Sequence, residues 1–87
     1  MSDIQLPGYH VTHIRKGVLG ELSKIREELD ELEDAAGQGI KIMELCELSD
    51  LVGAIRLYLC KHHPGISFDD LFKMSRATER AFEVGER

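Results

Sequence analysis

Residues 40–62 read IKIMELCELSDLVGAIRLYLCKH, and this stretch decides the fold. Apolar side chains surround the axis of a helix built through it. Between residues 42 and 60 the only charged side chains are Glu44, Glu47, Asp50 and Arg56. A helix that is apolar all round is normally buried. Because the neighbouring helices of one short chain cannot cover it fully, we expect a homodimer, or a tetramer, in which a second copy completes a four-helix bundle.

A second periodic stretch precedes this one, over residues 17–36. Its apolar residues recur at steps of three and four positions, which predicts one amphipathic helix. They are Val18, Leu22, Ile25, Leu29, Leu32 and Ala36. Gly37-Gln38-Gly39 then breaks the pattern. Residues 17–36 and 40–62 are therefore expected to form an antiparallel helical hairpin.

The chain continues into a shorter helical segment. Pro64 ends the helix predicted over 40–62, because proline disfavours helix in the residue before it. Ser67 offers an N-cap hydroxyl to a third helix, predicted over 67–84. Residues 1–16 form a lead-in that is either a loop or helical. We predict one all-α domain over residues 1–87, with two long antiparallel helices and a shorter C-terminal helix.

The composition excludes several function classes. A formal charge of -5 argues against a nucleic-acid polymer as the main partner, since phosphate backbones need clustered Lys and Arg. No run reaches the roughly 18 apolar residues of a membrane span, and the N-terminus lacks signal-peptide features, so we expect a cytoplasmic protein. Cys46 and Cys60 lie about 21 Å apart on one helix, too far for a disulfide.

Acidic residues embedded in the apolar stretch are the candidate functional groups. Glu47 and Asp50 are three residues apart and therefore share a helix face. Glu28 and Glu31 have the same spacing on the preceding helix. Unpaired buried carboxylates are costly, so acids in such a position are normally neutralised, paired or bound to metal. Oxygen-only ligand sets suit Mg²⁺, or Mn²⁺ in its place, and a clustered Mg²⁺ site favours hydrolysis of phosphoanhydrides.

A simpler interpretation stands beside this one. The run Glu27-Glu28-Leu29-Asp30-Glu31 is also typical of a solvated helix face with weak surface pairing, such as Lys24 with Glu28. On this view the chain is a non-catalytic acidic helical module for dimerisation or interaction. A third hypothesis is a degenerate homologue that binds nucleotides without turnover.

The two acidic groups together resemble a known signature. Glu27-Glu28-Leu29-Asp30-Glu31 followed by Glu47-Leu48-Ser49-Asp50 is similar to the EExxE…ExxD motif of the MazG-like all-α nucleoside triphosphate pyrophosphohydrolases, and the resemblance extends from about residue 16 to residue 87. It implies cleavage of an NTP or dNTP between the α and β phosphates, which gives NMP or dNMP and pyrophosphate. Compact members are common in bacteriophages, so a phage-encoded copy would act in the host cytoplasm.

The same resemblance implies roles for individual residues. Glu28, Glu31, Glu47 and Asp50 are then the Mg²⁺ ligands, and Glu27 is a supporting catalytic acid. It also places basic phosphate contacts in the third helix, where Lys73 and Arg80 share a face.

Two further groups are left as structural rather than functional. Lys16 and Lys24 are interpreted as surface lysines, although both are alternative phosphate contacts. His10 and His13 are spaced to bind a metal only if the lead-in is helical, and an ordinary loop carrying two histidines is the simpler expectation.

Overall fold

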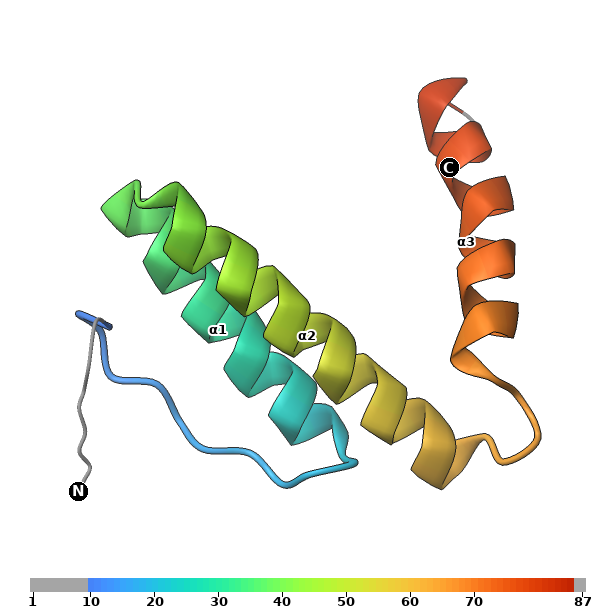
Figure 1. Cartoon of the computed structure of the whole chain (residues 1–87), viewed down its shortest axis with the longest axis horizontal. Coiled ribbons are helices and arrows are strands. Elements are labelled where there is room, and N and C mark those ends of the chain that lie inside the picture. The colour runs from blue at the N-terminus through green and yellow to red at the C-terminus, as the bar shows by residue number, and fades with distance from the viewer. Residues whose placement is uncertain (1–9, 86–87) are drawn as a thin grey trace.

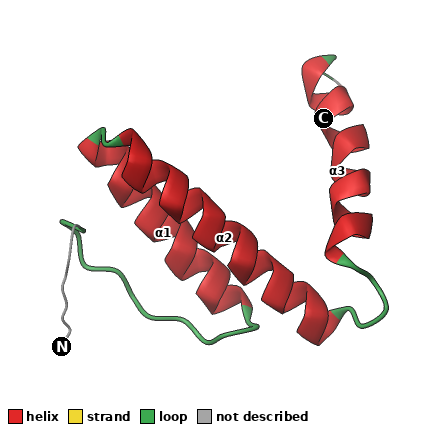
Figure 2. Cartoon of the chain, viewed as in Figure 1, coloured by secondary structure: helices red, strands yellow, loops and turns green. Residues whose placement is uncertain are grey.

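The structure is a computed structural model that describes residues 10–85. It contains α1 (Leu22–Gln38), α2 (Lys41–His62) and α3 (Phe68–Glu83). No strand occurs in the part of the chain described (Figure 2). The predicted all-α class is therefore confirmed, whereas the dimeric four-helix bundle stays a prediction. None of these three helices is long and apolar enough to cross a membrane.

Helices α1 and α2 lie side by side as an antiparallel hairpin (Figure 1). Gly39 makes the connection between them. Its φ of 75° is left-handed, and its backbone N–H bonds to the carbonyl of Ala36, which satisfies one of the last carbonyls of α1. At the open end, Glu21 forms ion pairs with Lys61 and with His62, the latter at 3.0 Å. The two helices are thus joined at both ends.

The first helix begins at Leu22, five residues later than predicted. The backbone N–H of Gly17 instead donates to the Glu27 carboxylate at 2.8 Å. Gly20 adopts a φ of 82° and is buried. A Cβ atom at this position would lie 3.0 Å from the Cδ atom of Lys61 in α2. A left-handed residue interrupts a right-handed helix, so α1 cannot extend back through Gly20. Residues 10–20 form an irregular segment that runs along the hairpin (Figure 1).

Helix α3 starts as the sequence predicts, within one residue. The Ser67 side chain accepts from the Asp70 backbone N–H, and the Asp70 carboxylate accepts from the Ser67 N–H, each at 3.0 Å. This capping box satisfies two donors that would otherwise lack a helical partner. Beyond it, α3 projects away from the hairpin (Figure 1).

The interior of the hairpin is unusually acidic. Its buried apolar side chains are Ala35, Ala54 and Leu59, whereas its buried charged side chains are Glu27, Glu28, Asp34 and Glu47. Carboxylates in such surroundings require hydrogen bonds, cationic side chains or bound cations. The candidate functional groups of the hairpin are therefore its buried carboxylates.

Candidate metal centre

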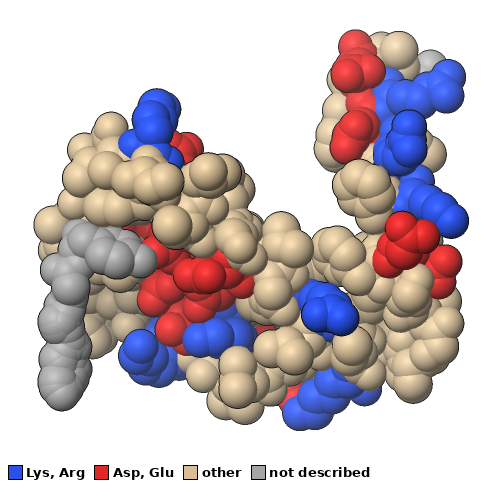
Figure 3. All heavy atoms as spheres, in the orientation of Figure 1, with Lys and Arg blue, Asp and Glu red and all other residues tan. Residues whose placement is uncertain are grey.

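Carboxylates from both helices converge in the middle of the hairpin. Oxygen atoms of Glu28, Glu47 and Asp50 lie within 4.8 Å of one another, as do oxygen atoms of Glu27, Glu28 and Glu31. Glu28 belongs to both groups and links them. All five acids predicted from the sequence are thus brought together, and Figure 3 shows acidic side chains gathered on one face of the hairpin beside basic ones.

The helical geometry explains which acids are deepest. Glu47 is only 1 % exposed and Glu28 only 5 %, because both lie on the contact line between α1 and α2. Asp50, one turn along α2 from Glu47, is exposed. The expectation that Asp50 would be embedded like Glu47 is therefore wrong for a single chain. Asp50 sits at the rim of the group, where an incoming ligand would meet it first.

A cleft of about 620 Å³ opens beside these carboxylates. Glu27, Glu28 and Glu31 line one wall of it, and Asp50 lines the other. Three basic side chains also line it, namely Lys16, Lys24 and Arg56, together with Ser49, Gly53, Ala54 and Leu57. The cleft thus combines carboxylates with basic side chains, an arrangement suited to a phosphate ester that carries a divalent cation.

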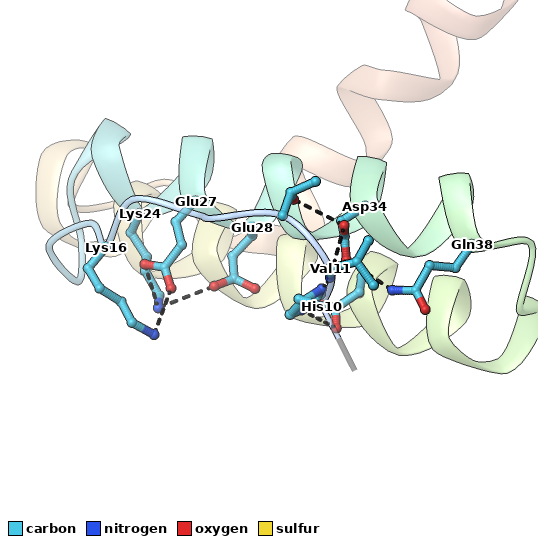
Figure 4. A network of polar contacts seen from close by, with 10 residues as sticks. His10, Val11, Lys16, Lys24, Glu27, Glu28, Asp34 and Gln38 are labelled. Carbon is cyan, nitrogen blue, oxygen red and sulfur yellow. Dashed lines mark hydrogen bonds and ion pairs between the residues drawn. The ribbon is translucent and has the colours of Figure 1, made fainter. Parts of the chain in front are cut away.

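Glu27 is held by cations and by backbone. It lies 3.2 Å from the Lys24 Nζ and 3.6 Å from the Lys16 Nζ. Burial alone would raise the pKa of Glu27, but the hydrogen bonds from Gly17 and Lys24 outweigh it and hold that pKa below its usual value. Lys24 also reaches Glu28 at 3.2 Å (Figure 4). Glu27 therefore fixes two lysines at the edge of the cleft.

Glu31 is in the opposite electrostatic situation. Burial, followed by the charges of Glu28, Glu47 and Glu27, raises its pKa from 4.5 to about 8. Near neutral pH, without a cation, this carboxyl group holds a proton. The folded pKa lies above the unfolded value, so Glu31 opposes folding increasingly as the pH rises from 4.5 to about 8.

This raised pKa predicts that Mg²⁺ binding depends on pH. A cation that takes the place of the Glu31 proton must release it, so the Mg²⁺ affinity should rise by up to about tenfold per pH unit below pH 8 and level off above it. Calorimetric titration at pH 6.5, 7.5 and 8.5 measures this. In Glu31→Gln the Mg²⁺ affinity should change little with pH. A wild-type Mg²⁺ affinity that does not change between pH 6.5 and 8.5 would contradict the prediction.

Asp34 is a functional candidate that the sequence did not reveal. It is 7 % exposed and anchors the segment before α1. It accepts hydrogen bonds from the Val11 backbone, from Thr12 and from Gln38, and lies 2.8 Å from the His10 ring (Figure 4). The loop expected around His10 is observed, yet His10 reaches the acidic group without any helix. Its Nε2 lies 3.5 Å from the Glu47 carboxylate.

Lys73 and Arg80, the predicted phosphate contacts, are not brought to the cleft of their own chain. Both belong to α3, and Lys73 pairs with Asp69 at 3.2 Å on that helix. The basic residues at the cleft are instead Lys16, Lys24 and Arg56. Phosphate contact by Lys73 and Arg80 stays a prediction.

Comparison with known proteins adds no family assignment, because no family model, curated protein or solved structure matches the chain. The donor set itself can be tested against a cation. Glu28, Glu47 and Asp50 offer only carboxylate oxygens, two of these residues are buried, and all three approach within 4.8 Å. Hard divalent cations such as Mg²⁺ and Mn²⁺ prefer such ligands, so the residues fit one.

Proposed function

We propose that the chain is a Mg²⁺-dependent nucleotide pyrophosphohydrolase of the MazG-like kind, which converts an NTP or dNTP to the monophosphate and pyrophosphate. The observation that carries the proposal is the convergence of Glu28, Glu47 and Asp50 beside a cleft that basic side chains also line. A group of carboxylates with no basic side chains beside it would attract a cation but would repel a triphosphate.

Each side chain has a distinct part in this proposal. Glu28, Glu47 and Asp50 would hold the cation, with Glu31 as the fourth ligand implied by the resemblance. A bound Mg²⁺ ion polarises a phosphoryl oxygen and favours attack by water. Lys16 and Lys24, positioned by Glu27, would contact phosphate oxygens from one edge. Arg56 would do so from the other.

The direct test is a substrate screen. Purified protein is incubated with each common NTP and dNTP in the presence of Mg²⁺, and the products are separated by anion-exchange chromatography. We expect at least one nucleotide to give equal amounts of monophosphate and pyrophosphate, and we expect EDTA to stop the reaction. If every nucleotide stays intact while circular dichroism shows a folded helical protein, the enzymatic proposal fails.

A second candidate function is supported by a different observation. The outer face of α2 exposes large apolar side chains, at Ile42, Leu45, Leu48 and Val52. Contiguous exposed apolar residues of this kind mark interaction surfaces. A non-catalytic helical interaction module would use this face and leave nucleotides intact. The substrate screen therefore separates the two functions, and dimerisation is compatible with both.

A further inference from the structure

The first residues of the described segment before α1 are bonded to one buried carboxylate, Asp34. Both oxygens of Asp34 receive hydrogen bonds from this segment. The Thr12 hydroxyl donates to one at 3.0 Å, and the Val11 backbone N–H donates to the other at 3.1 Å. Gln38, one turn along α1, donates to Asp34 as well. Several partners therefore determine where the neighbouring His10 ring is placed.

Asp34 also determines how that ring is turned. The His10 Nδ1 lies 2.8 Å from an Asp34 oxygen, and the pKa of Asp34 is lowered because this contact and its other hydrogen bonds outweigh burial. The ring thus stands between two carboxylates, with Nδ1 toward Asp34 and Nε2 3.5 Å from a Glu47 oxygen. Metal-binding histidines in proteins usually have this arrangement, with a carboxylate behind the ring.

We propose that His10, Glu31 and Glu47 form a second metal site, selective for a transition-metal dication such as Co²⁺ or Zn²⁺. One ligand atom from each residue lies within 4.8 Å of the others. The Nε2 to Glu47 oxygen distance is 3.5 Å, and two ligands about 2.1 Å from a tetrahedral ion are about 3.4 Å apart. Imidazole favours such metals over Mg²⁺.

This site shares Glu31 and Glu47 with the proposed Mg²⁺ site and differs from it in one essential residue, His10. The Mg²⁺ ligands Glu28 and Asp50 offer oxygen only, whereas the second site adds a nitrogen donor from outside the hairpin. Glu31 and Glu47 belong to both proposed sites, and each would lie between two ions. The inference goes beyond the proposed function, because ion binding at His10 requires neither a nucleotide nor turnover.

Titration with Co²⁺ tests the site in the full chain without nucleotide. Saturating Mg²⁺ occupies the oxygen-only site, and the visible absorption of Co²⁺ reports nitrogen and oxygen coordination. We expect His10→Ala to weaken this Co²⁺ binding at least tenfold and Asp34→Asn to weaken it about tenfold. His13→Ala, which removes an exposed histidine from the same segment, is the matched control and should bind like the wild type.

A measurement on the wild-type protein excludes the possibility that a substitution weakens Co²⁺ binding only by displacing the segment before α1. One equivalent of Zn²⁺ should shift the Nε2 resonance of His10 in ¹⁵N NMR and leave the His13 ring unchanged. If the His10 resonance does not move, the ring is only an ion-pair partner of Asp34 and Glu47, and the proposal is overturned. Loss of nucleotide hydrolysis would not produce that result, so the two proposals fail independently.

Discussion

Glu47→Gln is expected to lower Mg²⁺-dependent nucleotide hydrolysis by about 10³-fold or more while the hairpin stays folded. Glu47 is the most deeply buried acid of the hairpin and belongs to both the Glu28, Asp50 group and the His10, Glu31 group. A metal ion supplies several kcal/mol of charge stabilisation in the transition state, and about 4 kcal/mol corresponds to about 10³-fold in rate. The amide keeps the side-chain shape but removes the anionic ligand.

The matched control for this variant is Glu44→Gln. Glu44 lies one turn before Glu47 on α2, pairs with Lys41 at 3.6 Å and belongs to none of the three potential metal-binding groups in the described residues. Its activity should stay within about twofold of the wild type. Metal-free stability of Glu47→Gln should be equal or slightly higher, since repulsion among the acids falls. Full activity in Glu47→Gln would remove this residue from the site.

The hairpin and its acids were predictable because their determinants are local. Helical periodicity, the glycine at the turn and the serine N-cap each act within a few residues, and an i, i+3 spacing places Glu47 and Asp50 on one side of α2. The depth of each acid was less predictable. Burial depends on where α1 packs, which makes Glu28 buried and leaves Asp50 at the rim.

The residues that the sequence did not reveal depend on tertiary structure. His10 and Asp34 are 24 positions apart, and they meet only because the segment before α1 folds back along the hairpin. The late start of α1 has the same origin, since Gly17 bonds to a side chain ten residues ahead. Helical spacing alone cannot signal such contacts. The sequence offers no local signal that separates Asp34 from the other acids of the first helix.

The basic residues of the cleft illustrate the same limit. Lys73 and Arg80 share a face of α3, but that face does not border the cleft of the same chain. Lys16 and Lys24 were interpreted as surface lysines, with phosphate contact as the alternative. Their contacts with the buried Glu27 carboxylate place them at the cleft. The position of these two lysines at the cleft is therefore determined by their ion pairs with Glu27.

A Leu45→Glu, Val52→Glu double variant should be a monomer, whereas we expect the wild type to be at least a dimer. Both residues lie on the face of α2 that points away from α1, and Leu45 is 61 % exposed in the single chain. A second copy that covers this face removes apolar area from water and completes the four-helix bundle. Carboxylates placed in that interface cost about 4 kcal/mol or more, which weakens association by about 10³-fold.

Sedimentation equilibrium at micromolar concentration decides between the two states, because the monomer mass is 9.8 kDa. The control is Leu19→Glu, which introduces the same charge at a position 65 % exposed in the segment before α1. It should leave the assembly intact, since Leu19 does not belong to the apolar face of α2. A wild-type chain that sediments as a stable monomer would show that the apolar face of α2 serves some partner other than a second copy.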